Sequence, residues 1–383
     1  MNAARIWGLA VSCFLLISTQ GCANSQDIQN MAYVTAIGID YVNGRYVSYV
    51  QVLNFVNVAR TENLPQGTKV PVWVGKGDGD TVSGSLSAIN ATSQLRLYWG
   101  HVKAVILTEN LLRKGVLETY QALNRYREVR YNILMYGTKE KLDDVLIQKS
   151  ILNLPPLDSI VFTAAQMNSQ KTYIIPISSN RIIAELNEPG EPCMLPSITI
   201  DRNNWTEDKK TKTMFDINGA YFFKNHIMNN WMSAEDLKGA RWMEYKLDQT
   251  PVRIPKQGPP VAVVMMAHPK LSVEPVGSGD SSQFNMKVNV KGFVIELIKT
   301  TSITALEDQT REVIRDEIET TYRKALKAKC DPFKLQQTLY REKPATFRKL
   351  KEKQPFFLHE DSIREIKINV HLRSTGKYKG KTE

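Results

Sequence analysis

Apolar and polar side chains alternate along residues 284–290 and again along residues 366–373, which is the period of a half-buried strand. The alternation changes phase at Gly292, and this predicts a β-bulge there. Between the two segments, residues 307–329 place apolar side chains every three or four positions, the pattern of a long helix with one buried face. Two shorter helices are expected within residues 335–353. The pattern therefore predicts a compact α+β unit of strand, long helix, short helices and strand.

Earlier in the chain, residues 32–40 and 45–53 are rich in β-branched and aromatic residues and flank Asn43-Gly44. Asn-Gly is the strongest short-range signal of a β-hairpin, because both positions tolerate a positive φ. A glycine cluster follows at residues 75–79. We predict a flexible turn there and reject a phosphate-binding loop, since Asp78 and Asp80 would repel a phosphate.

Helical periodicity then alternates with apolar strand-like segments through residues 82–149, which predicts an α/β layer. Residues 197–201, 213–223 and 260–266 read as strands of a second, mainly β unit. The complete expectation is an α+β protein with a signal peptide followed by three mixed α/β domains. The predicted boundaries are 1–21 for the signal peptide, 22–200 for an N-terminal α/β domain, 201–268 for a middle mainly β domain, and 269–383 for a C-terminal α+β domain with a basic tail.

The first 22 residues have the layout of a secretory signal peptide. Arg5 precedes a nearly apolar run at residues 6–17, and this run is shorter than the roughly 20 residues that a membrane-spanning helix needs. Residues 18–21 are small or polar and lead to Cys22. Together they resemble a bacterial lipobox, in which Cys22 would carry a lipid and become the new N-terminus. Two alternatives remain: an ordinary secretory peptide with Cys22 as a free thiol, or an N-terminal membrane helix.

The net charge of +11 is concentrated near the end of the chain, where residues 341–383 hold 12 Lys and Arg against 6 Asp and Glu. This excess fits either a solvated basic face or attraction to anionic lipid headgroups. Nucleic acid is not an expected partner of an exported protein. After Cys22, the remaining cysteines of the exported chain are Cys193 and Cys330, and we expect two unrelated buried thiols.

The sequence lacks the signatures of common catalytic and metal sites. Its five histidines are scattered without metal-ligand spacing, and His101 is expected to be structural. Four acids of the predicted long helix read as a solvated face: Glu312, Asp316, Glu317 and Glu319. We therefore predict no catalytic residue, metal ligand or cofactor, and we expect that the protein is not an enzyme.

The order of motifs along nearly the whole chain resembles the Ger(x)C family, the lipoprotein C subunits of spore germinant receptors. The residues that carry the resemblance are Cys22 after the signal, residues 34–40, Trp99 to Ile106, residues 113–115, Arg125 with Glu128 and Arg130, Trp231 to Gly239 with Trp242, residues 330–333, Leu339-Tyr340 and the closing strand. Thr19 departs from the usual lipobox, and Tyr126 stands where the family tends to have Asp.

The resemblance implies three α/β-type domains that are tethered by Cys22 to the outer face of the spore inner membrane. It also implies integral-membrane A and B receptor subunits as partners and a role, without an enzymatic step, in nutrient-triggered germination. Two other classes stay open: a lipid-anchored solute-binding protein and an anchored cell-wall hydrolase.

Overall fold

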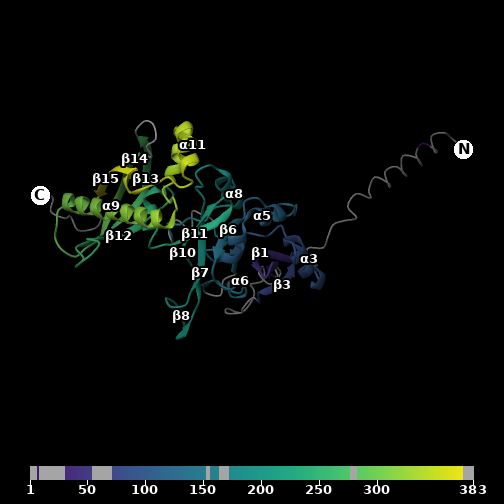
Figure 1. Cartoon of the computed structure of the whole chain (residues 1–383). Coiled ribbons are helices and arrows are strands. Elements are labelled where there is room, and N and C mark those ends of the chain that lie inside the picture. The colour runs from purple at the N-terminus through teal and green to yellow at the C-terminus, as the bar shows by residue number, and fades with distance from the viewer. Residues whose placement is uncertain are drawn as a thin grey trace.

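The computed structural model describes residues 31–53, 71–151, 156–163, 172–276 and 283–373, together with Trp7. Its strands form two large sheets and one small two-stranded sheet, and its helices pack against the two large sheets (Figure 1). The strands are β1 (Met31–Val42), β2 (Arg45–Leu53), β3 (Trp73–Gly79), β4 (Arg96–Tyr98), β5 (Ala104–Thr108), β6 (Leu134–Thr138), β7 (Met194–Asp201), β8 (Thr206–Glu207), β9 (Lys210–Thr211), β10 (Met214–Lys224), β11 (Ile227–Ser233), β12 (Thr250–Ile254), β13 (Ala262–Val276), β14 (Gln283–Leu297) and β15 (Ile363–Arg373). The α-helices are α3 (Val82–Thr92), α4 (Glu109–Lys114), α5 (Leu117–Asn124), α6 (Leu142–Leu146), α8 (Ser179–Asn187), α9 (Ile303–Ala328), α10 (Leu335–Glu342) and α11 (Pro344–Lys353), and the 3-10 helices are η4 (Pro156–Asp158), η5 (Lys238–Met243) and η6 (Glu360–Ser362).

The described strands of the first sheet run in the order β11-β10-β7-β6-β5-β1-β2-β3, with β4 beside the start of β1. Its centre is parallel, because β1, β5, β6 and β7 pair in parallel, whereas the outer strands pair antiparallel. The predicted hairpin is confirmed: β1 and β2 are joined by Asn43 and Gly44, whose φ angles are 50° and 80°.

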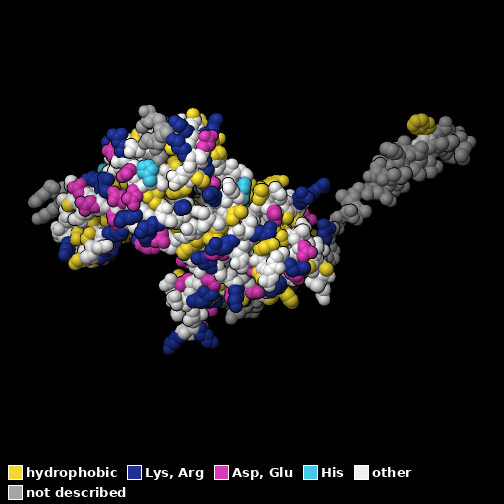
Figure 2. Space-filling view, viewed as in Figure 1, with side chains coloured by type: hydrophobic (Ala, Val, Ile, Leu, Met, Phe, Trp, Pro, Cys, Tyr) yellow, Lys and Arg dark blue, Asp and Glu magenta, His cyan; other side chains and the backbone are white. Residues whose placement is uncertain are grey.

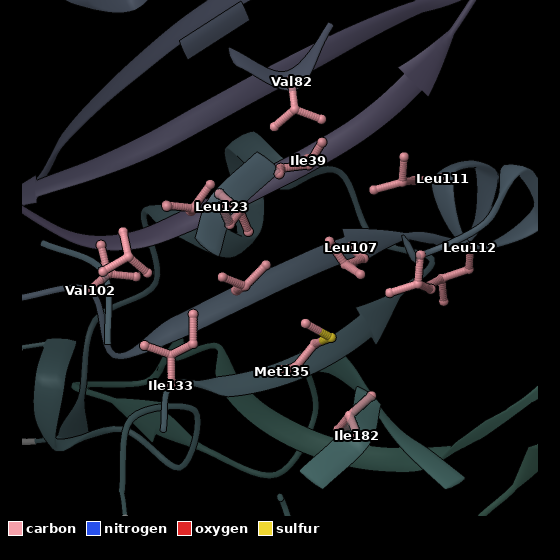
Figure 3. Close-up of a cluster of buried hydrophobic side chains, with 14 of the residues drawn as sticks. Ile39, Val82, Val102, Leu107, Leu111, Leu112, Leu123, Ile133, Met135 and Ile182 are labelled. Carbon is pink, nitrogen blue, oxygen red and sulfur yellow. The ribbon is translucent and has the colours of Figure 1, made fainter. Parts of the chain in front are cut away.

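Helices cover both faces of this sheet, and for that reason β5 is buried at every position. One face packs against α3, α4, α5 and α8, and Figure 3 shows Leu107 and Met135 of the strands among side chains such as Leu111, Leu123 and Ile182 of those helices. The other face packs against α6. The alternation of helices and strands therefore produces the α/β layer that the sequence predicts.

The glycine cluster forms strand β3, so the prediction of a flexible turn is wrong. The cluster allows α3 to approach the strand closely. A Cβ at Gly75 would lie 2.8 Å from Cγ2 of Ile89, and a Cβ at Gly77 would lie 2.5 Å from the carbonyl oxygen of Ser85. Glycine at alternate positions places hydrogen atoms on the face toward the helix, and a larger side chain there would separate the two elements.

The second sheet has the order β12-β13-β14-β15 and is covered by α9, α10 and α11. Residues Val313, Ile314 and Ile318 of α9 are buried against the strands, and β14 pairs in parallel with β15. The predicted C-terminal unit of strand, long helix, short helices and strand is confirmed, and so is the α+β class.

The predicted bulge at Gly292 is wrong. Gly292 keeps continuous register with Met266 on one side and with Leu372 on the other. The irregularities lie elsewhere, between Ala267 and Lys270 of β13 and opposite Ile295 of β14. Position 292 requires glycine for a steric reason instead, because a Cβ there would lie only 2.4 Å from the carbonyl oxygen of Met265.

Residues 201–268, which were predicted to form a middle mainly β domain, contribute strands to both sheets. Strands β10 and β11 pair within the first sheet, whereas β12 and the first part of β13 belong to the second. The 3-10 helix η5 lies between them in the chain and packs against α9. This stretch therefore connects the two sheets.

Candidate functional site

The predicted lipid site, Cys22, lies outside the described residues. Within the ranges that the structure describes, no helix is long and apolar enough to cross a membrane, and no three His, Cys, Asp or Glu side chains come together as metal ligands. Cys193 and Cys330 are both free and buried, as expected. Burial raises the pKa of both thiols, that of Cys330 to about 12.

The carboxyl edge of the parallel strands is where open α/β sheets usually bind ligands. Here Thr108 and Thr138 end β5 and β6 beside a depression of about 560 Å³. Asp40 accepts hydrogen bonds from the hydroxyl of Thr108 and from the backbone N–H of Tyr41.

Two further carboxylates at this edge are also engaged. Arg202 donates to Glu140 at 3.1 Å, Thr199 donates at 2.6 Å, and the guanidinium holds the pKa of Glu140 below its usual range. Glu109 pairs with Arg113 at 2.7 Å and faces Lys139 at 3.7 Å. The carboxylates of Glu140 and Glu109 are therefore paired with basic side chains of the same chain, and this arrangement is typical of a structural role.

A buried ion pair joins η5 to α9. Arg241 and Glu317 are each 4% exposed, and their side chains are 2.7 Å apart. Glu317 also accepts from the indole N–H of Trp242 at 2.9 Å, while Arg241 donates to the hydroxyl of Thr250 at 2.9 Å. The indole is buried as well, at 1% exposure.

The prediction that Glu317 belongs to a solvated face is therefore wrong. Glu317 follows Val313 by four residues and precedes Thr321 by four, and all three lie on the buried face of α9. That spacing was the available signal in the sequence. The partner could not be found in this way, because Arg241 is distant in the chain and lies in a 3-10 helix.

A second set of contacts joins α8 to α10. Arg341 donates to Glu188 at 2.7 and 3.1 Å, and Gln337 donates to the same carboxylate at 2.6 Å. Lys334 pairs with Glu185 at 3.1 Å. The turn after α8 approaches α10 so closely that a Cβ at Gly190 would lie 2.6 Å from the backbone nitrogen of Gln337. The first and second sheets are thus linked by charged as well as buried contacts.

Motifs that lie about 30 residues apart in the sequence come together at the amino ends of the parallel strands, opposite the carboxyl edge of the first sheet. Glu128 accepts from the backbone N–H of Trp99 at 3.0 Å and pairs with Arg96 at 3.4 Å. The rings of Trp99 and Tyr126 pack with centroids 5.4 Å apart. Next to them, His101 packs edge-on to Tyr33 at 5.0 Å, so it has the structural surroundings that the sequence led us to expect.

The tryptophans of the middle stretch differ in their surroundings. Trp242 is core, whereas Trp231 is partly buried and has the ammonium of Lys139 at 3.9 Å from its ring centroid. The packing of Trp242 and the contact between Trp231 and Lys139 are both made within this chain.

Comparison with known proteins identifies relatives over most of the chain. The family model described as "Spore germination protein N-terminal domain" matches residues 24–200, and "Spore germination B3/ GerAC like, C-terminal" matches residues 218–376. The chain is 23% identical over 390 residues to spore germination protein KC of Bacillus subtilis (strain 168), with 96% of this chain and 95% of that protein covered. It is 21% identical to the putative spore germination protein YfkR of the same organism over 377 residues, with 95% of this chain and 94% of that protein covered.

Among solved structures, the crystal structure of the GerBC protein superimposes with a TM-score of 0.53 at 16% sequence identity. The superposition covers 91% of this chain and 100% of that chain. At this identity the match establishes the shared fold.

Proposed function

We propose that this chain, which belongs to the GerAC-like family of spore germination proteins, is a lipid-anchored, non-catalytic subunit of a nutrient germinant receptor. A role in spore germination follows from the family. The observation that carries the finer proposal is the succession of both family models along residues 24–376, directly after a lipobox-like segment that ends at Cys22.

In this proposal the lipid on Cys22 holds the protein on the outer face of the spore inner membrane. Two or three acyl chains give stable attachment, because each buried CH2 contributes about 0.8 kcal/mol. The partners are the integral-membrane A and B subunits of the receptor. A non-catalytic role is supported by the carboxyl edge, where Asp40, Glu109 and Glu140 are engaged in internal contacts.

The anchor is tested by replacing Cys22 with alanine in the full chain and expressing it in spores. Acyl labelling should disappear, and the protein should leave the membrane fraction when the partner subunits are deleted. Cys193→Ala is the matched control, since it removes a cysteine and leaves the lipobox intact. Full membrane retention of Cys22→Ala without partners would refute the lipid anchor.

The receptor assignment is tested separately by crosslinking in spore inner membranes. Recovery of multi-spanning partner subunits is expected, and their absence would overturn the assignment. A saturable rise in melting temperature with amino acids or sugars would instead favour a solute-binding protein, and activity on purified cortex peptidoglycan would favour a cell-wall hydrolase.

A further inference from the structure

Basic side chains gather at the amino edge of the parallel strands. Strands β1, β5 and β6 begin at this edge, and α5 ends there because it leads from β5 back to the start of β6. Dark blue Lys and Arg side chains are visible on the α3–α5 end of the molecule in Figure 2. The amino-edge surface consists of five exposed residues: Arg96 in β4, Lys103 before β5, Arg125 and Arg127 after α5, and Arg130 before β6.

The charge of this surface is not cancelled by the acids around it. Two depressions of 450 and 300 Å³ open on it, and Glu128 is the one acid among the described residues that line them. Glu128 is already bonded to Arg96 and to the backbone of Trp99. Among the described residues, Arg125 and Arg127 form no ion pair with a carboxylate.

The groups around this surface also bear on its charge. Near Arg125, Glu118 pairs with Lys114, whereas Asp80 shares Arg45 with Asp78 and is only partly neutralised. Burial lowers the pKa of His101, and the charges of Arg130 and Lys103 lower it further.

The amino-edge surface also lies where the chain arrives from its N-terminal segment. Strand β1 begins at Met31, which pairs with Arg96. Nine residue steps separate Met31 from Cys22, and they span at most about 30 Å when fully extended. A lipid on Cys22 would therefore keep this edge of the sheet close to the bilayer, whereas the carboxyl edge points to the opposite side.

We infer that the amino-edge surface binds the anionic phospholipid headgroups of the membrane that holds Cys22, and so orients the first sheet with its amino edge toward the bilayer. The inference rests on the proposed anchor for its geometry. The charge complementarity is independent of the anchor: five cations, with Glu128 paired to Arg96 as the one acid among them, would meet anionic headgroups. Contact with headgroups adds orientation to an attachment that the acyl chains already provide.

The test uses the mature chain from residue 22 with Cys22→Ser, so that any binding is due to protein side chains. Its co-sedimentation is measured with vesicles of phosphatidylcholine alone and with vesicles that contain about one third phosphatidylglycerol. Binding is expected with the anionic vesicles and should weaken as salt is added.

The informative variant is Arg125→Gln/Arg127→Gln, and the matched control is Lys209→Gln/Lys210→Gln. The control removes the same charge from the β8–β9 hairpin, which follows the carboxyl end of β7. Each basic side chain near an anionic surface strengthens binding about five-fold, so the arginine variant should bind about 25-fold more weakly, whereas the control should stay within about two-fold. Melting temperatures should match the parent, since all four side chains are exposed.

Equal losses in both variants would show a response to net charge alone and would overturn the inference. Equal binding to neutral vesicles would also overturn it. A third contrary result is no vesicle binding together with weaker crosslinking of the arginine variant to partner subunits, which would assign the surface to an acidic protein partner. Acyl labelling of the full chain with its native Cys22 tests the proposed anchor separately. The Arg125→Gln/Arg127→Gln substitutions should leave that labelling unchanged.

Discussion

Replacing Glu317 with alanine would leave the guanidinium of Arg241 buried without its counter-charge. The wild-type carboxylate accepts from Arg241 at 2.7 and 3.0 Å and from Trp242 at 2.9 Å. Because Glu317 and Arg241 are each 4% exposed, water cannot replace these bonds without opening the contact between η5 and α9. The variant therefore tests whether this pair holds the connecting stretch against the C-terminal unit.

Removal of one partner from a buried ion pair costs about 3–5 kcal/mol. The indole N–H of Trp242 would also lose its acceptor, and since the same carboxylate serves both donors, we expect about 4 kcal/mol in total for Glu317→Ala. A loss of this size should lower the melting temperature by about 10 °C.

Urea unfolding followed by far-UV circular dichroism provides the free energy. The control is Glu312→Ala, which removes an exposed acid from the same helix and should change the free energy of unfolding by no more than about 0.5 kcal/mol. The double variant Glu317→Leu/Arg241→Met removes both charges and should recover most of the loss. If Glu317→Ala lies within about 1 kcal/mol of Glu312→Ala, the pair does not stabilise the structure and the reasoning fails.

Three further outcomes are expected. Gly77→Ala should cost about 1–3 kcal/mol in urea unfolding, because its Cβ would lie 2.5 Å from the carbonyl oxygen of Ser85; an unchanged midpoint would mean that α3 can move away freely. Burial raises the pKa of Asp331 from 3.8 to about 6, so its contribution to stability is complete below about pH 4 and is lost as the pH rises through 6. The unfolding free energy of the wild type minus that of Asp331→Asn should therefore decrease as the pH rises from about 4 to above 6. A difference that does not change with pH would contradict the raised pKa of Asp331. In the Cys22→Ser chain, Cys193 and Cys330 should react with a thiol reagent only after denaturant is added, and rapid labelling of the native protein would show that they are accessible.

The spacing of apolar residues was sufficient to predict those elements that have one buried face and one exposed face. The hairpin around Asn43-Gly44 and the buried face of α9 around Ile314 and Ile318 are local patterns, and the structure contains both. The lipobox-like segment before Cys22 is a local pattern too, and its modification remains a prediction.

The sequence by itself thus determined the α+β class, the order of most elements and the resemblance to a germination family, because these depend on side-chain spacing along the chain. Tertiary structure alone decided why Gly77 must be glycine, since the reason is a helix that packs against the strand. It also decided that Glu317 is buried, because its partner Arg241 lies 76 positions away. The amino-edge surface has the same origin: Arg96 and Arg127 share a depression because parallel strands bring separate connections to one edge of the sheet.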